Sequence, residues 1–315
     1  MDELIPRCDS VATKMMPLLS AKPWPLLIPP GWAVCGLLLA VLAVGLSPLH
    51  AQDNYFVTYS HELEDPGTLE VSAKNIAGSP KGGDAFLASA LEFEYGIKTW
   101  WTTEFYLDGQ TTSGQSTLFT GFRWENRIRT LRREHWINPV LYFEFANING
   151  ADKTLLEVVG HDSRADFLGR NSRQEKKREA EFKLILSSNF KGWNISENFL
   201  AEKNLANAPW EFGYAVGGSH KLATASSARP CTFCRQSFAV GAEMYGGLGD
   251  GHRFGLNHTS HYAGPVLTWA LPRGPELRFS PNFGLNGNSN GCLFRFTVSY
   301  EIERFLSRLK RRSKL

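Results

Sequence analysis

Charged side chains recur at every second position in several segments of the sequence. In ASALEFEYGIKTWWTTEFYLD (residues 88–108), glutamates alternate with apolar and aromatic residues. Alternate residues of a strand share a face, so this spacing gathers the charges on one side of a sheet. The candidate lining of that polar side is Glu92, Glu94, Lys98, Glu104, Arg123, Glu125, Arg127, Glu144, Arg278 and Arg295.

Two interpretations of this charged face are open. Like charges in a narrow space repel, so arginine and lysine have to interleave with the glutamates. Such ion pairs could fill the interior of a small closed sheet and serve structure alone. The same residues could instead line a pore that selects ions or polar solutes.

Cys231-Thr-Phe-Cys234 is a C-x-x-C motif. No histidine follows it, which excludes the c-type haem attachment pattern, and no second such pair completes a structural zinc site. A thioredoxin-like redox site needs a βαβ context that the surrounding sequence lacks. In an exported protein we therefore expect a local disulfide, with free or metal-bound thiols as alternatives.

Three histidines lie close together in GHRFGLNHTSHY: His252, His258 and His261. Histidine is a common metal ligand, but few carboxylates are nearby, Asp250 being the main one. A solvated loop is therefore preferred over a metal site.

A hydrolase would need a serine and a base. Outer-membrane phospholipase A carries a His-x-Ser-Asn-Gly pattern, which residues 289–291 resemble in its last three positions, but Gly287 stands where histidine is needed. Residues 258–260 have the His-x-Ser spacing without the following Asn-Gly. Neither fragment is complete, so we predict no catalytic residues, no metal and no cofactor.

The elements that carry these residues are predicted to be strands. Period-two alternation returns in segments of about ten residues separated by Gly, Pro, Asn and Asp, whereas helical periodicity is nearly absent. No segment of the mature chain approaches about 18 uninterrupted apolar residues, so no transmembrane helix is expected. Twelve strands are predicted, at 68–77, 85–95, 97–108, 116–127, 138–148, 179–189, 193–203, 210–219, 237–247, 262–271, 276–285 and 292–303.

The direction in which the apolar faces point decides the fold class. A soluble sandwich turns them inward, whereas a transmembrane barrel turns them toward lipid and keeps polar residues in the lumen. Membrane-spanning strand lengths, an even strand count and aromatics near strand ends, such as Trp101, Trp124, Trp210 and Tyr300, favour the barrel. We predict an all-β, antiparallel up-and-down transmembrane β-barrel of about 12 strands, with a soluble ligand-binding sandwich as its main rival.

The N-terminal region has the features of an export signal. No charged residue occurs from Pro23 to Gln52, Gly36 to Leu46 is a compact apolar run, and Lys14 and Lys22 precede it. We interpret residues 1–51 as a secretory signal peptide, with translation starting at Met1 or at Met15/Met16; an uncleaved anchor is the alternative. Residues 52–303 are assigned to the barrel and 304–315 to a basic tail, solvated and disordered or touching acidic lipid head groups.

Several segments resemble known proteins. The last strand, with Phe294, Phe296, Val298 and Tyr300, is similar to the terminal strand of bacterial outer-membrane barrels, which serves the barrel-assembly machinery, although here the chain continues beyond it. EFEYGI, TTEFYLDG, FTGFRWENR and NPVLYFEF resemble segments of porin-like outer-membrane proteins. The resemblance covers most of residues 54–303 and implies an architecture without a known activity.

This topology places the N-terminus in the periplasm. Short inner turns are expected at Gly96, at 189–192 and at 272–275, and outward loops at 108–116 and 149–178. Whether 149–178 folds into the lumen is left open.

Function follows from the class of fold. The net charge of +3 is too small to argue for a nucleic-acid partner. We expect a protein in the outer membrane of a Gram-negative bacterium, in contact with its lipid, that passes small polar or charged solutes passively. A closed structural barrel is the alternative, and a barrel-borne hydrolase a distant one.

Overall fold

The computed structural model describes residues 54–312, apart from 81, 116, 155–157, 162–175, 207, 224–230 and 273. The signal peptide predicted at residues 1–51 lies outside the described residues. Among these residues, no helix is long and apolar enough to cross a bilayer.

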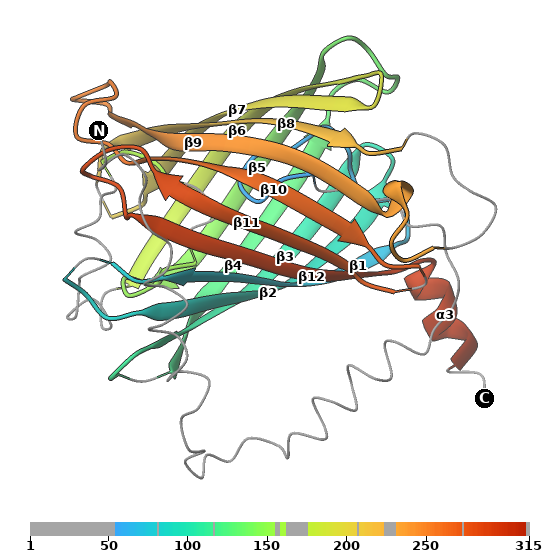
Figure 1. Cartoon of the computed structure of the whole chain (residues 1–315), viewed down its shortest axis with the longest axis horizontal. Coiled ribbons are helices and arrows are strands. Elements are labelled where there is room, and N and C mark those ends of the chain that lie inside the picture. Colours follow the sequence, from blue (N-terminus) through green and yellow to red (C-terminus); the bar gives the residue numbers. More distant parts are fainter. Residues whose placement is uncertain are drawn as a thin grey trace.

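Twelve antiparallel strands form one closed barrel (Figure 1). Each strand pairs with its neighbour in sequence, and β12 pairs with β1 to close the sheet. The strands are β1 (Leu69–Gly78), β2 (Phe86–Lys98), β3 (Trp101–Thr112), β4 (Thr117–Arg129), β5 (Asn138–Asn149), β6 (Lys176–Phe190), β7 (Trp193–Asn204), β8 (Trp210–Lys221), β9 (Phe238–Asp250), β10 (His261–Ala270), β11 (Glu276–Gly284) and β12 (Cys292–Ile302). The prediction of an up-and-down barrel is confirmed.

The two faces of the sheet are inverted relative to a soluble sandwich. Leu91, Phe105 and Trp124 are 40–47% exposed on the outside, whereas Glu92 and Glu104 are each 1% exposed on the inside. Successive residues of a strand point to opposite faces of the sheet. The pairing register therefore determines which residues face outward in each strand. The apolar exterior and polar interior are the pattern of a membrane barrel.

Two local expectations were wrong. Gly96 lies within β2 rather than in the turn, which falls at residues 99–100. A Cβ at Gly96 would lie 2.2 Å from the carbonyl oxygen of Asp65, so a close backbone approach explains this glycine. The C-terminal tail is not a disordered extension: Phe305–Arg312 forms the helix α3.

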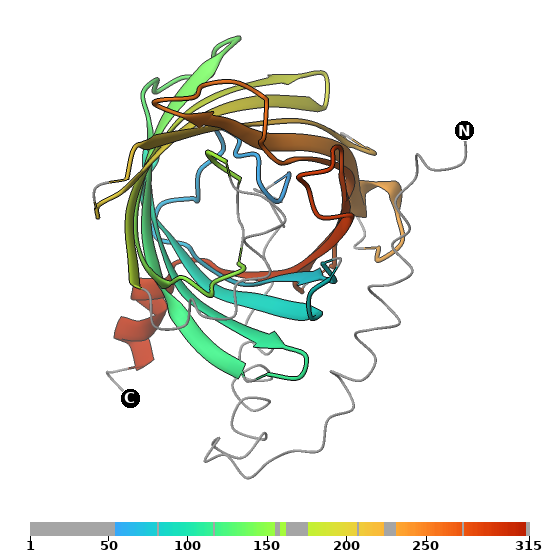
Figure 2. The same ribbon diagram turned by 90° about the vertical axis from the view of Figure 1, so that its left-hand side faces the viewer.

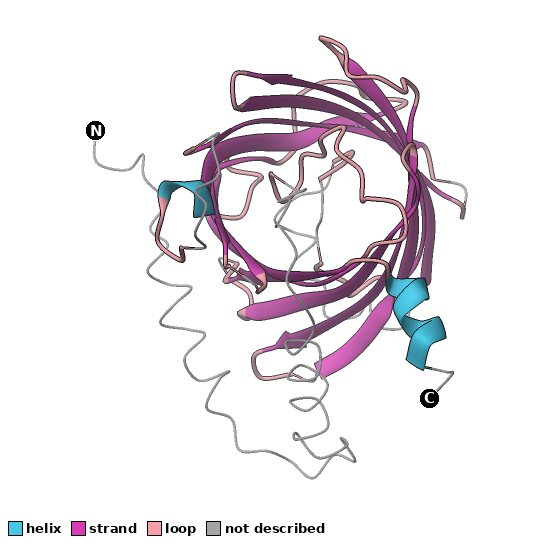
Figure 3. Ribbon diagram, turned by 90° about the vertical axis from the view of Figure 1, so that its right-hand side faces the viewer, coloured by secondary structure: helices cyan, strands magenta, loops and turns pink. Residues whose placement is uncertain are grey.

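The two ends of the barrel differ. The α3 end carries the connections after even-numbered strands, including the short 3-10 helix η3 (Arg235–Ser237) between β8 and β9; the opposite end, here the loop end, carries the connections after odd-numbered strands (Figure 1). Viewed along the barrel, chain segments lie inside the ring of strands (Figures 2 and 3). They are residues 54–65, here called the luminal segment, and part of the connection after β5.

Candidate functional site

The charged wall of the lumen centres on Arg127, which is fully buried. Its Nη2 donates to Glu94 at 2.5 Å and its Nε to Glu104 at 2.6 Å, and Glu125 lies 3.6 Å from Nε. β2, β3 and β4 are neighbours in the sheet, and their register brings these carboxylates together. The predicted interleaving of arginine with glutamate is therefore present in the described structure.

A second arginine joins the same wall. Arg123 makes a two-pronged ion pair with Asp108, both contacts at 2.8 Å, and lies 3.8 Å from Glu144. The hydroxyl oxygen of Tyr106 lies 2.7 Å from carboxylate oxygens of both Glu92 and Glu104, within hydrogen-bond distance of each. Tyr106 was not among the predicted residues, because an aromatic residue carries no charge by which the alternation could select it.

The remaining predicted residues are spread around the barrel. Arg278 donates to Glu276 at 2.9 Å and to the backbone oxygen of Tyr55 at 3.0 Å. Arg295 donates to Asn282 at 2.9 Å and to the hydroxyl of Tyr245 at 3.1 Å. Lys98 differs from the rest, because it is the last residue of β2 and is exposed, so it does not line the enclosed part of the lumen.

The luminal segment is held to the wall mainly through its backbone. The amides of Phe56, Val57 and Thr58 donate to one oxygen of Glu243, at 3.2, 2.9 and 3.2 Å. Asn198 accepts from the amide of Tyr59 at 2.6 Å and donates to its carbonyl at 2.9 Å. These side chains supply the hydrogen bonds that a neighbouring strand would otherwise provide.

Side chains of the segment reach other strands. The hydroxyl of Tyr55 donates to Asn194 on β7 at 2.9 Å, and that of Tyr59 to Glu125 on β4 at 3.2 Å. Near the α3 end, the amide of Glu64 donates to Thr102 on β3 at 3.2 Å. The segment therefore spans the lumen from wall to wall.

His61 anchors the segment near the α3 end. Its Nδ1 lies 2.8 Å from the hydroxyl of Ser187, and its Nε2 lies 2.9 Å from Glu134. Burial lowers the pKa of His61; the charges of Glu134 and Glu62 act in the opposite direction, and that of Arg129 acts with burial. The lowered pKa favours the neutral imidazole, so we describe the contact with Glu134 as a hydrogen bond rather than an ion pair.

An apolar cluster occupies part of the loop-end half of the lumen. Val57 of the segment packs in a buried cluster with residues of the wall and with Val158 from the connection after β5; the wall members are Ile76, Phe86, Ala88, Ala215, Tyr245, Tyr262 and Leu293. The described parts of that connection fold toward the wall, where the amide of Gly160 donates to Phe212 at 2.9 Å. Glu104, Glu125 and Arg127 are at most 1% exposed, so the lumen is occupied at their level.

The His and Ser motifs do not form the pairs that a hydrolase needs. His261 contacts Tyr214 at 3.1 Å and Thr259 at 2.8 Å through its ring, whereas Ser289 donates to the backbone oxygen of His261. Within the described residues, no group of three metal-ligand side chains includes His252, His258 or His261. His252 and His258 line an open groove at the loop end.

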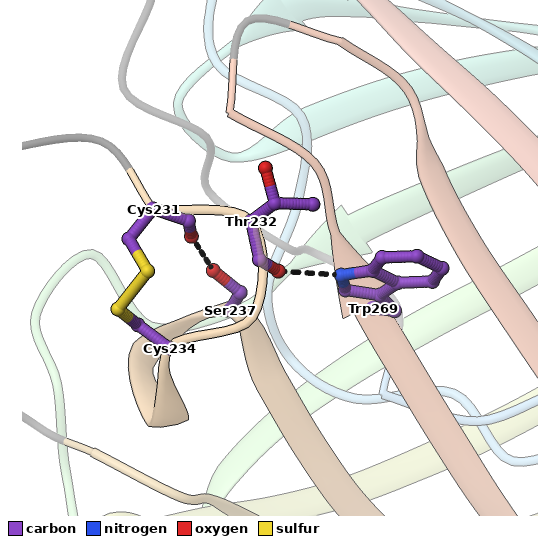
Figure 4. The surroundings of a disulfide bond; sticks show 5 residues. All are labelled: Cys231, Thr232, Cys234, Ser237 and Trp269. Carbon is purple, nitrogen blue, oxygen red and sulfur yellow. Dashed lines mark hydrogen bonds between the residues drawn. A yellow bond between two sulfur atoms is a disulfide. The ribbon is translucent and has the colours of Figure 1, made fainter.

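The C-x-x-C motif forms a disulfide at the α3 end, outside the barrel wall (Figure 4). Cys231 and Cys234 are joined with a Cα–Cα distance of 5.5 Å. Trp269 on β10 donates its indole N–H to the carbonyl of Thr232 at 2.8 Å, and Ser237 donates to that of Cys231 at 2.6 Å. The bond therefore shapes a surface turn and does not touch the lumen wall.

Comparison with known proteins finds likeness in structure alone. No protein-family profile matches the sequence, and no curated protein matches it. An outer-membrane channel from Pseudomonas putida F1 aligns over 76% of this chain and 97% of its own, with 11% identity and a TM-score of 0.48. KdgM porin aligns over 73% and 98%, with 8% identity and a TM-score of 0.44, and NanC porin over 74% and 100%, with 10% and 0.43.

Proposed function

We propose that this barrel is a porin-like outer-membrane channel for small polar or charged solutes, with the luminal segment as a resident plug. One observation carries the proposal: the segment crosses the lumen without joining the sheet. It is held largely by side chains of the wall, such as Glu243 and Asn198, whose hydrogen bonds water could replace when the segment leaves. The wall thus exposed would carry charges of both signs.

The outer surface supports a membrane location. Strands of 9–15 residues suit the thickness of a bilayer, and the sheet presents apolar side chains outward along its whole circumference. In water this surface would be costly, because each Å² of apolar area contributes about 25 cal/mol on removal from water. Lipid is therefore the proposed partner, and the pattern of Phe294 to Tyr300 in β12 fits recognition by an assembly machinery.

A closed structural barrel is the second candidate. The apolar cluster around Val57 favours it, because moving the segment would expose that cluster to water. The two candidates differ in whether the segment ever leaves.

Single-channel recording in a planar bilayer separates them. The full-length wild type is compared with a Glu243→Ala, Asn198→Ala variant, whose segment has lost its main acceptors. A channel predicts rare openings in the wild type and frequent ones in the variant. If the protein is a channel, substituting Glu104→Gln or Arg123→Gln should change its preference among ions. Silence of both proteins after proven insertion would favour the closed barrel.

The absence of catalysis stays a prediction. One described serine–histidine contact, Ser187 with His61, continues to Glu134, but all three side chains serve to hold the segment. Ser187 also accepts from Asn194 and Ser196, at 3.2 and 2.9 Å. A serine-reactive probe should leave Ser187, Ser260 and Ser289 unlabelled, and labelling of any of them would reopen the hydrolase alternative.

A further inference from the structure

Three carboxylates converge where the luminal segment leaves the barrel at the α3 end. They belong to Glu64 of the segment, Glu70 on β1 and Glu301 on β12, and oxygen atoms of the three lie within 4.8 Å of one another. Glu70 and Glu301 are direct cross-strand partners in the β1–β12 register. Glu70 accepts from the hydroxyl of Ser72 at 2.7 Å, and like charges placed directly opposite each other destabilise a sheet.

Glu64 is the member that points to a ligand. It is 2% exposed, and its buried Oε2 has no hydrogen-bond partner in the described part of the chain. No lysine or arginine of that part forms an ion pair with it. A neutral carboxylic acid would need an acceptor for its hydroxyl, and an ionised one would need a cation, so in either form Glu64 is aimed at something the described chain does not supply.

A neighbouring acidic cluster provides the comparison. Glu92, Glu94 and Glu104 also lie within 4.8 Å of one another. There the chain supplies the cations, because Lys74 contacts Glu92 at 2.9 Å and Arg127 contacts the other two. Arg127 is also the arginine whose charge acts on Glu64, but its hydrogen bonds are directed to Glu94 and Glu104. In that cluster cations of the chain pair with the carboxylates, whereas the buried Oε2 of Glu64 has no partner in the described part of the chain.

We propose that Glu64, Glu70 and Glu301 bind a hard divalent cation, best matched by Ca²⁺, which fastens the luminal segment to β1 and β12. Carboxylate oxygens are the ligands that Ca²⁺ prefers, at about 2.3–2.6 Å, so one ion can bridge oxygens about 5 Å apart. The three carboxylates fall within that span. The ion links a residue of the segment to both strands at the closure of the barrel, and withdrawing it frees that end of the segment.

The consequence for gating rests on the proposed function, but cation binding can be measured without any channel activity. Purified full-length protein in detergent is titrated with CaCl₂ by calorimetry after treatment with EDTA, at constant ionic strength. We expect one site in the wild type, lost in Glu64→Gln and in Glu301→Gln. Glu62→Gln is the matched control, since it makes the same change in the same segment outside the cluster, and it should bind like the wild type.

Hydrogen exchange tests the fastening. With Ca²⁺ at about 100 times its Kd, the amides of residues 56–64 should exchange about 100-fold more slowly than in EDTA, because a ligand of the closed state shifts opening by 1 + [L]/Kd. Glu64→Gln should abolish that difference. The inference is overturned if the wild type binds no Ca²⁺, if both glutamine variants still bind it, or if binding leaves exchange of the segment unchanged. A barrel that binds Ca²⁺ yet never conducts would instead count against the channel.

Discussion

Removing the carboxylate of Glu243 should release the luminal segment while the barrel stays intact. Three amides share one oxygen of this side chain, at 2.9–3.2 Å. A hydrogen bond to a charged group contributes about 1.5–3 kcal/mol, and because one oxygen is shared we expect a total near the upper value, about 3 kcal/mol. In Glu243→Ala the population with the segment released should then rise about 150-fold, at about 1.4 kcal/mol per factor of ten.

Hydrogen exchange at the amides of residues 56–58, read by mass spectrometry in detergent, measures that population. Glu243→Gln is the matched control, because its amide oxygen still accepts and should cost about 1.4 kcal/mol, a tenfold change. Heat-modifiable gel migration verifies that each variant still forms a barrel. Unchanged exchange at these amides in an intact Glu243→Ala barrel would refute the role given to Glu243.

Three further outcomes follow from the described contacts. Arg127→Met should lower the free energy of unfolding by about 3–5 kcal/mol, because it leaves buried carboxylates without their cation. Arg129→Met breaks a pair with the half-exposed Glu134 and should lower it by at most about 1 kcal/mol. Denaturant melts in detergent measure both. Lowering the pH through about 6.5 should speed hydrogen exchange of the luminal segment, because the pKa of His61 is lowered in place and a released His61 therefore takes up the proton first; His61→Gln should remove this dependence. Reduction of the Cys231–Cys234 disulfide should cost at most about 2 kcal/mol and leave conductance unchanged, since the bond closes only a short loop outside the barrel wall.

Most of the fold could be predicted because one physical pattern specifies it repeatedly. The predicted strands at 138–148 and 193–203 differ from β5 and β7 by a single residue at one end. Alternation is a local signal, and each strand carries it independently of its partners. Gly96 was misplaced because glycine marks both turns and close contacts, and the contact that decides it, with the carbonyl of Asp65, comes from a segment outside the sheet.

The same alternation of charged and apolar residues predicted part of the candidate site. Nine of the ten predicted lining residues lie in the enclosed interior. They could be identified because charged residues that alternate with apolar ones are visible in the sequence. Glu243 also faces the lumen but was missed, since the residues two positions away on the same face, Gly241 and Tyr245, are uncharged and no second charge repeats beside it. The partner of Glu243, the backbone at 56–58, gives no sequence signal, because every residue has an amide.

An open pore and a filled barrel make the same demand on the wall, namely polar side chains facing inward. What distinguishes them is chain that enters the lumen, and such chain has to satisfy its own backbone groups without a sheet. For the luminal segment, Glu243 accepts from the amides of residues 56–58, Asn198 pairs with both backbone groups of Tyr59, and Val57 is packed among apolar side chains. Inward-facing polar side chains such as Glu243 and Asn198 are therefore compatible with both an open pore and a filled barrel. The choice between them is decided by how strongly the segment is bound, which is a free energy of a few hydrogen bonds and one apolar cluster. That balance is small enough for a single cation, or a single proton on His61, to shift it.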